Sequence, residues 1–468
     1  MRNIVIYSDG TGQRGGRLFD ERRSNIYKLF RATRCGPDSS VDPAKQLTFY
    51  DPGLGTAPPG HEGSGLIGTA ARAFYNLVCQ ATGLGITRNI IDCYAAIIRL
   101  WRPGDRIFLF GFSRGAYTVR CLSAVISLCG IPTRYKTGDP LLRDEKTARR
   151  IAKEAVKKVY QHTESRKTFR TQRLKELFSQ REELGRRFRE RYASNDATRP
   201  NNANVYPYFI GVFDTVASLA EPVLAVSLFL AAILFLALPT WGIVSWLGSD
   251  VRFWTWFAAL AGGGILLAGL SLLTSLIRFE FGLPINSNWR PLHFTKIHME
   301  QYETDLSVEV SWARHAISID EHRKSFPRVE WGGSYSDKKT EPADWFEQRW
   351  FAGNHSDIGG SYPENESRLS DISLQWMLEA AVAAGLQYDP SVLKLYPDPT
   401  GPQHDEARSS VFRFAPKVLR QIPNDAPLHN SVLERFKASD VLQYDTTKPY
   451  RPANLRNHEA VKQYYAGF

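Results

Sequence analysis

A buried strand that runs directly into a glycine-flanked serine is the strongest constraint on this fold. The strand, RIFLF at 106–110, is apolar on both faces, as in a parallel sheet. Gly111-Phe112-Ser113-Arg114-Gly115 follows, and AYTVRCLSAVISLCG then has the apolar spacing of a helix packed on a sheet. Strand, tight turn and helix form the context of a nucleophile elbow, which lifts a serine hydroxyl above the sheet. We expect Ser113 to be a nucleophile; the alternative is a structural serine in an ordinary turn.

The chain before this turn alternates strands with helices. Short apolar segments at 3–8 and 47–50 predict strands, each closed by an Asp-containing turn. From Ile86 to Trp101 the apolar residues recur on one helical face, and Pro103-Gly104 ends the helix. This alternation predicts an α/β fold, with a mostly parallel sheet and helices on both faces, like that of the α/β-hydrolases.

A serine hydroxyl becomes a good nucleophile only when a base takes its proton. In α/β-hydrolases the chain order is Ser, then Asp or Glu, then His. Asp214 ends the strand-like VYPYFIGVFD, so it is the expected acid, unless it only caps a turn. His355 lies on the glycine-rich loop of WFAGNHSDIGGSY and is the expected base. His315 and His322 flank another strand-like run, where a structural histidine is the more usual role.

The same logic selects groups for an oxyanion hole. The Arg114 N–H opens the helix after Ser113, and an N–H from Gly10 or Thr11 in the first strand's loop is the second candidate. Asp357, two residues beyond His355, either shapes that loop or binds a metal. We assign no metal ligand and expect no cofactor.

Gly10, Gly12 and Gly15 also match the dinucleotide-binding fingerprint, because they follow a strand. The fingerprint must open a helix, but the residues after Gly15 are polar and lack helical periodicity until about Ser24. Asp51, the next strand-end acid, is too far along the chain for the usual ribose contact. A nicotinamide-dependent enzyme is therefore disfavoured.

Nearly the whole net charge of +11 lies in one segment. Between Arg134 and Pro200 there are 20 Lys or Arg residues and 10 Asp or Glu residues. We expect a basic helical insert at 146–199, which either meets anionic headgroups or is simply solvated. The remainder is close to neutral, which argues against a nucleic-acid surface. The five cysteines form no CxxC pair and are expected to be reduced.

Two long apolar runs follow. Residues 222–249 and 253–277 contain no charged side chain over 28 and 25 positions, more than the roughly 20 that a helix needs to cross a bilayer. They predict a two-helix transmembrane hairpin at 222–278, with a buried helical pair as the alternative. The catalytic domain would then comprise 1–145 and 279–468, with 200–221 returning to the sheet, on the cytoplasmic side of a multi-pass membrane protein.

Several motifs together resemble one family. DGTGQ, YDPGLGT, GDRIFLFGFSRGAYTVR, GVFDTVASL, HAISIDEHR, WFAGNHSDIGGSY, LSDISLQWM and YRPANL occur in that family's order. The chain resembles the catalytic domain of type VI secretion phospholipase effectors, an α/β-hydrolase family.

The resemblance implies a serine lipase for glycerophospholipid acyl esters, with its triad on Ser113, Asp214 and His355. It implies membrane lipids as the substrate and an immunity or delivery protein as a partner, while the predicted hairpin would make the same lipids the anchor. Two alternatives remain open: a non-catalytic membrane signalling module on a hydrolase fold, and an esterase for small soluble esters.

Overall fold

The fold is taken from a computed structural model of the whole chain. It describes residues 1–10, 22–53, 84–163, 172–216, 255, 277–279, 283–284, 292–294, 305–331, 344–408 and 416–466.

A six-stranded parallel sheet forms the centre of the molecule. Its strands are β1 (Asn3–Ser8), β2 (Gln46–Asp51), β3 (Arg106–Phe112), β4 (Pro207–Phe213), β7 (Trp312–Ser318) and β8 (Phe346–Phe351), in the spatial order β2-β1-β3-β4-β7-β8. Every neighbouring pair is parallel. The α/β class and the mostly parallel sheet are thus confirmed. The strand order reverses direction between β1 and β3, and open α/β sheets bind ligands at such a switch point.

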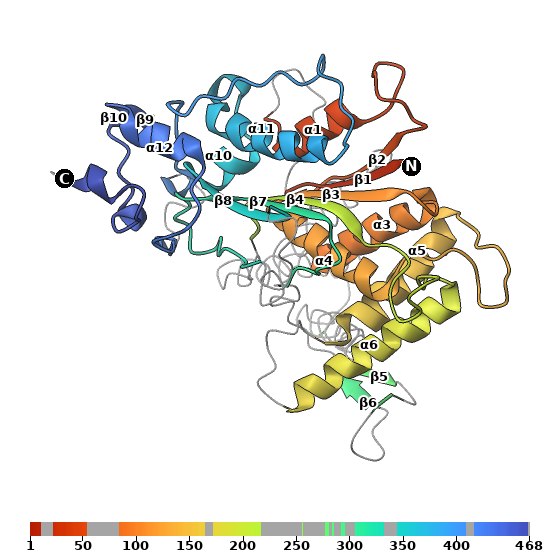
Figure 1. The fold of residues 1–468 in the computed structure, drawn as a ribbon. Helices are drawn as coiled ribbons and strands as arrows, with labels where there is room; N and C mark the ends of the chain where they lie inside the picture. Colours follow the sequence, from red (N-terminus) through yellow and green to blue (C-terminus); the bar gives the residue numbers. More distant parts are fainter. Residues whose placement is uncertain are drawn as a thin grey trace.

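Helices cover both faces of the sheet (Figure 1). One face carries α1 (Asn25–Thr33), α10 (His355–Gly359) and α11 (Arg368–Ala383). The other carries α3 (Leu84–Leu100), α4 (Arg114–Cys129), α5 (Glu145–Glu154) and α6 (Gln172–Tyr192). Because β1, β3 and β4 are buried on both sides, their side chains contribute alternately to two apolar clusters, one under each helical layer.

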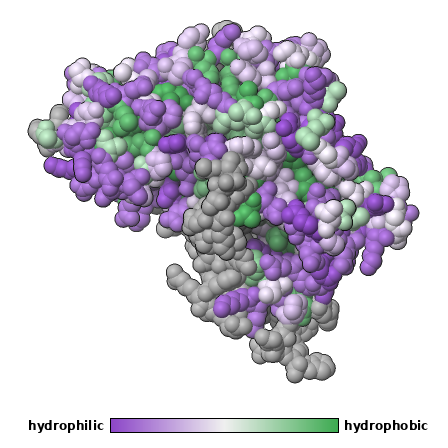
Figure 2. Space-filling view, in the orientation of Figure 1, coloured by the Kyte–Doolittle hydropathy of each residue, from purple (hydrophilic) through white to green (hydrophobic). Residues whose placement is uncertain are grey.

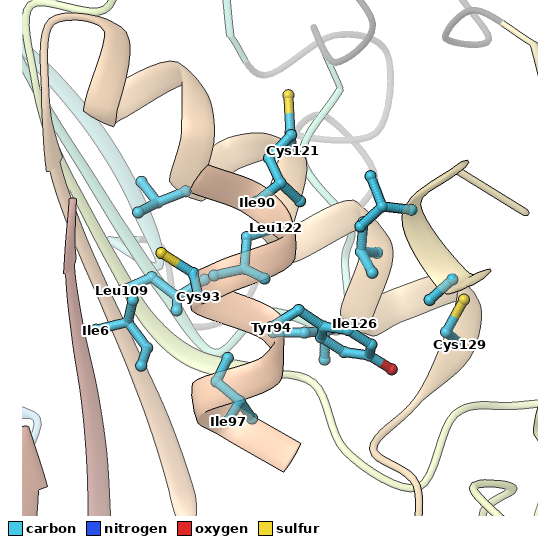
Figure 3. Packing of buried hydrophobic residues seen from close by; sticks show 14 of the residues in the cluster. Ile6, Ile90, Cys93, Tyr94, Ile97, Leu109, Cys121, Leu122, Ile126 and Cys129 are labelled. Carbon is cyan, nitrogen blue, oxygen red and sulfur yellow. The ribbon is translucent and has the colours of Figure 1, made fainter. Parts of the chain in front are cut away.

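Figure 3 shows the cluster beneath α3 and α4. Ile6 of β1 and Leu109 of β3 lie against Cys93 and Ile97 of α3, and Ile126 of α4 lies against the ring of Tyr94. The described cysteines, Cys35, Cys93, Cys121 and Cys129, are all free thiols.

The predicted basic insert contains α5 and α6, and part of it is buried. Ile151, Leu184 and Phe188 belong to the cluster under α3 and α4, although charged side chains cover the outer surface. The expectation of an insert that either meets headgroups or is solvated therefore misses an apolar face. The two helices are amphipathic, and they bury the apolar face against α3 and α4, the helices that cover this side of the sheet.

A third apolar cluster joins the C-terminal part of the chain to the edge of the sheet. It packs side chains of α12 (Asn430–Lys437) against Ile317 of β7 and Trp350 of β8. The remaining described elements are short: β5 (Ile277–Phe279), β6 (Leu292–Phe294), β9 (Val441–Gln443), β10 (Thr446–Lys448), a π-helix (Ala155–Val159), and 3-10 turns at Tyr160–His162, Glu364–Glu366, Glu406–Arg408, Ala453–Leu455 and Lys462–Tyr465.

The predicted transmembrane hairpin at 222–278 lies outside the described residues, except for Thr255 and the first two residues of β5. Within the described ranges, no helix combines the length and the apolar composition needed to span a bilayer. Most of the described surface in Figure 2 is hydrophilic, with smaller hydrophobic areas between the charged groups.

Candidate active site

Ser113 lies in a strained turn between β3 and α4. Its backbone has φ 59° and ψ −123°, which a residue with a Cβ rarely adopts. Two glycines permit the turn: a Cβ on Gly111 would lie 2.5 Å from the Gly115 carbonyl oxygen, and one on Gly115 would lie 2.0 Å from that of Ser8. The Ser113 N–H donates to the Phe213 carbonyl at 3.1 Å, and its hydroxyl makes no capping bond with α4.

The turn sits at the switch point of the sheet. Gly10, directly beyond β1, comes so close that an added Cβ would lie 3.4 Å from the Ser113 Cβ. Ser113 is 6% exposed, so its side chain is shielded but not sealed within the protein.

Asp214 follows β4, the next strand along the sheet. It is fully buried and has φ 36°, another left-handed conformation for a residue that is not glycine. Its N–H donates to the Ala316 carbonyl at 2.8 Å, which fixes the backbone between β4 and β7. The Asp214 Oδ1 accepts the Ser318 N–H at 3.0 Å.

His355 is brought to Asp214 by the loop after β8. The ring Nδ1 and the Asp214 Oδ2 are 2.6 Å apart. The imidazole also lies 4.6 Å, centroid to centroid, from the ring of Phe112, the residue before Ser113, and Phe326 contacts it edge-on. The other nitrogen, Nε2, is buried and has no hydrogen-bond partner within the described part of the chain.

The position of His355 follows from the cap of α10. Asn354 accepts the Ser356 and Asp357 N–H groups at 2.8 and 3.0 Å, and the Asp357 carboxylate accepts the Asn354 N–H in return. This capping box fixes the first turn of the helix, in which His355 is the first residue.

The guanidinium of Arg420 also binds Asp214. The Arg420 Nη1 donates to Oδ1 at 2.5 Å, and Nη2 donates to Oδ2 at 3.0 Å. Burial alone would raise the pKa of Asp214, but Arg420 and then His355 hold it well below its usual range. Asp214 is therefore a carboxylate that can orient the imidazole and stabilise its protonated form.

Arg420 was not expected from the sequence. Its surroundings, KVLRQIPND, contain no motif, and it is 206 positions from Asp214 along the chain. Only the unusual presence of a buried arginine marks it, and burial is not visible in a single sequence.

Two of the three residues predicted for the oxyanion hole, Arg114 and Gly10, lie in the described part of the chain. Arg114 is the first residue of α4, directly after Ser113. The Gly10 N–H already donates to the Asp9 carboxylate at 2.7 Å, which also accepts the hydroxyls of Ser24 and Tyr50. Burial raises the pKa of Asp9 to about 6, although these hydrogen bonds lower it in part. Thr11 lies outside the described residues.

The rival histidines occupy other positions. His315 is fully buried in β7, where its Nδ1 lies 3.1 Å from the Gln348 Oε1. Burial, with a contribution from the positive charge of Arg120, lowers the pKa of His315 to about 3, so the ring is neutral. His322 lies beyond β7, in a loop where its carbonyl accepts the Val418 N–H. The histidine that hydrogen-bonds to Asp214 is His355.

Asp357 shapes the loop. Besides closing the capping box, its Oδ1 lies 2.8 Å from the Nδ1 of His404, and Oδ2 accepts the His404 N–H at 3.1 Å. Over the residues that the structure describes, no three His, Cys, Asp or Glu side chains are grouped to hold a metal ion.

Three comparisons place these features among known proteins. The family described as "T6SS, Phospholipase effector Tle1-like, catalytic domain" matches residues 2–257 and 271–380. A curated relative, "Uncharacterized protein YEL023C" of Saccharomyces cerevisiae, is 23% identical over 445 residues, which cover 84% of this chain. This chain spans only 58% of that relative's length.

Two solved structures are similar at low identity. One is an uncharacterized protein from Pseudomonas aeruginosa, with TM-score 0.36, 15% identity, and coverage of 84% of this chain and 48% of that one. The other is the Tle1 effector bound to the VgrG spike of the type 6 secretion system, with TM-score 0.35, 12% identity, and coverage of 84% and 76%.

Proposed function

This chain belongs to the Tle1-like family of type VI secretion phospholipase effector catalytic domains, and we propose that it is a serine lipase for glycerophospholipid acyl esters. In the proposal Ser113 is the nucleophile, His355 the general base and Asp214 the carboxylate that orients it. This would make the protein a carboxylic ester hydrolase of the phospholipase A kind, without a cofactor.

One observation carries the proposal. The 2.6 Å contact between the His355 Nδ1 and Asp214 leaves Nε2 buried and without a partner among the described residues, while the ring packs on Phe112, next to Ser113. A catalytic base needs this division, with one nitrogen held by a carboxylate and the other available for the nucleophile's proton.

The proposed reaction follows acyl-transfer chemistry. The Ser113 hydroxyl passes its proton to the His355 Nε2 and attacks the ester carbonyl. The Arg114 N–H stabilises the resulting oxyanion, together with an N–H from Gly10 or Thr11, which requires the Gly10 N–H to leave Asp9. His355 then protonates the leaving alcohol. Water, activated by the same histidine, releases the fatty acid and restores Ser113.

Fatty-acid release from mixed phospholipid vesicles tests the function. We expect release by the parent protein and its loss, by at least about 1,000-fold, in Ser113→Ala, because no other group replaces the nucleophile. Ser127→Ala is the matched control, since this serine lies on the same helix and its hydroxyl bonds to the Ser123 carbonyl.

Each other outcome selects an alternative. Cleavage of short soluble esters without any response to vesicles would identify a small-ester esterase. Equal release by the parent and Ser113→Ala would remove Ser113 from the chemistry. No reaction with any ester would favour a non-catalytic membrane module.

The membrane hairpin is a separate part of the proposal. Its support is the two uncharged runs within 222–278, which begin only eight positions after Asp214. A membrane anchor there would hold the active-site edge of the sheet near its substrate. The basic helices α5 and α6 would add attraction to anionic headgroups.

Delivery and immunity partners belong to the same proposal. The family's description names T6SS effectors, which supports a delivery partner for its members. Co-purification with a secretion-spike protein from the same organism would test this for the present chain.

A further inference from the structure

We propose that Arg420 is a positioning residue for the Asp214–His355 pair, supplied by a part of the chain that lies beyond the family match. The match ends at residue 380, and Arg420 is 40 positions further on. The catalytic consequence of this inference rests on the proposed function, but the geometry on which it stands does not.

The segment that carries Arg420 is attached to the loop after β7. The Lys324 N–H donates to the Pro416 carbonyl at 3.0 Å, and the Val418 N–H donates to the His322 carbonyl at 2.8 Å. The backbones of Arg323 and Lys417 pair in an isolated antiparallel β-bridge between the same two segments. These backbone bonds place Arg420 beside the ends of β4 and β7, where it is 8% exposed.

The guanidinium fixes the plane of the Asp214 carboxylate. Its two terminal nitrogens take one oxygen each, at 2.5 and 3.0 Å, while the other lone pairs accept the Ser318 N–H and the His355 ring. Arg420 is itself held, since Nη1 also donates to the Ser318 carbonyl and Nη2 to that of Phe326. A two-pronged contact of this kind fixes direction, which a lysine cannot do.

The same contact has an electrostatic consequence. A carboxylate alone would favour the protonated imidazole, because opposite charges attract. The positive charge of Arg420, which bonds to both Asp214 oxygens, opposes that effect. Removal of Arg420 would therefore leave the charge of Asp214 unopposed at His355, and a neutral ring is the form that can act as a base.

Other charges face this pair. The Glu321 Oε2 accepts the His355 N–H at 3.3 Å, and Arg323 is paired with the same carboxylate at 2.7 Å. Arg328 interacts electrostatically with Arg420 and Asp214. On α10 itself, Asp357 is paired with His404. Glu321 is thus paired with Arg323, and Asp357 with His404. The arginine that offsets the negative charge of Asp214 is Arg420.

The decisive measurement is the titration of the His355 ring, followed by NMR with labelled histidine and assigned by His355→Gln. In Arg420→Gln we expect the midpoint to rise by about one pH unit relative to the parent, because the opposing charge is gone. Arg435→Gln is the matched control: this buried arginine of α12 donates to the Pro399 and Gly401 carbonyls, not to Asp214. An unchanged midpoint in Arg420→Gln would overturn the proposal.

Arg420→Lys keeps the positive charge but loses the two-pronged contact, so it separates the effect of charge from that of geometry. It also provides a second test if Arg420→Gln fails to fold. We expect its His355 midpoint to stay near that of the parent, because a positive charge remains. Its rate of fatty-acid release should fall about 10- to 100-fold with KM nearly unchanged, because the carboxylate is no longer held in one plane. A Lys variant as active as the parent would overturn the positioning role.

The two proposals fail in different ways. If the parent releases no fatty acid, the phospholipase proposal fails, while the His355 titration still decides the role of Arg420. If the parent is active but the titration does not move in Arg420→Gln, only the inference about Arg420 fails.

Discussion

Two residues of the proposed site have a strained backbone. Ser113 and Asp214 both have a positive φ although neither is glycine, and each directly follows a strand of the sheet. Such conformations cost about 1–3 kcal/mol and persist where the surroundings fix them. Here β4 and β7 hold them, because the Ser113 N–H donates to Phe213 of β4 and the Asp214 N–H donates to Ala316 of β7.

These residues differ in how far the sequence predicts them. Ser113 could be selected because two glycines flank it after a strand, and Asp214 and His355 because each follows a strand-like run. Arg420 could not be selected, since its contact depends on a long-range fold that leaves no local pattern. The hydrogen bond that occupies the Gly10 N–H joins it to the adjacent Asp9, but it depends on a side-chain position that a sequence pattern does not show.

Asp51, at the end of β2, gives a prediction about stability and pH. Burial raises its pKa to about 7, while a hydrogen bond from the Ser8 hydroxyl lowers it in part. The folded chain therefore binds more protons than the unfolded chain between about pH 4 and pH 7, so the free energy of unfolding falls as pH rises through that window. Asp51→Asn removes this dependence.

Between pH 5 and pH 8 we expect the free energy of unfolding of the parent to fall by about 2–3 kcal/mol more than that of Asp51→Asn. Urea unfolding at the two pH values measures the difference. Asp38→Asn serves as the control, because that carboxylate is exposed and pairs with Arg34 on the surface. Parallel pH dependences for the parent and Asp51→Asn would show that Asp51 ionises as freely in the folded chain as in the unfolded one.

At the scale of elements, periodicity and breakers predicted the strands and helices well. The expected strand at 3–8 is β1, and the expected helix at 86–101 is α3 with its ends moved by one or two residues. The sequence did not indicate the buried face of α5 and α6, because their many charges mask a few apolar positions. It also did not indicate the π-helix at Ala155–Val159, which depends on local packing.

The approach of α4 to β1 depends on Gly115. A Cβ there would lie 2.0 Å from the Ser8 carbonyl oxygen, and backbone cannot move away as a side chain can. Gly115→Ala should therefore lower the free energy of unfolding by about 2 kcal/mol or more and displace the Ser113 turn. Gly36→Ala, where the nearest atom is the Asp38 carboxylate, should have a much smaller effect. Equal urea midpoints for the two variants would contradict this packing.

At the scale of the whole molecule, the parallel sheet followed from alternating strands and helices, but its strand order did not. The order brings Gly10, Ser113 and Asp214 to neighbouring strand ends, and the loop after β8 adds His355. The C-terminal part of the chain packs against β7 and β8 through the third cluster, and its segment before that cluster contributes Arg420 from beyond the family match. Long-range assembly of this kind cannot be derived from local patterns.

The membrane anchor is a property of the whole molecule as well. Replacing residues 222–277 by a short Gly-Ser linker should move the protein from the membrane fraction to the supernatant in a flotation assay, because the two uncharged runs are lost. A control variant keeps residues 222–277 and has Lys157 and Lys158 neutralised. It separates attachment by the hairpin from attraction to the headgroups. Retention of the deletion variant on vesicles would exclude the hairpin as the anchor.

The central claim is that Ser113, His355 and Asp214 act as one catalytic unit, and covalent labelling tests it most directly. A fluorophosphonate probe reacts with a serine whose proton a neighbouring base removes. Peptide mass mapping should locate the label on Ser113 in the parent, with labelling slowed at least about 100-fold in His355→Ala and in Asp214→Asn. Label on another residue, or an unchanged labelling rate in both variants, would contradict the claim.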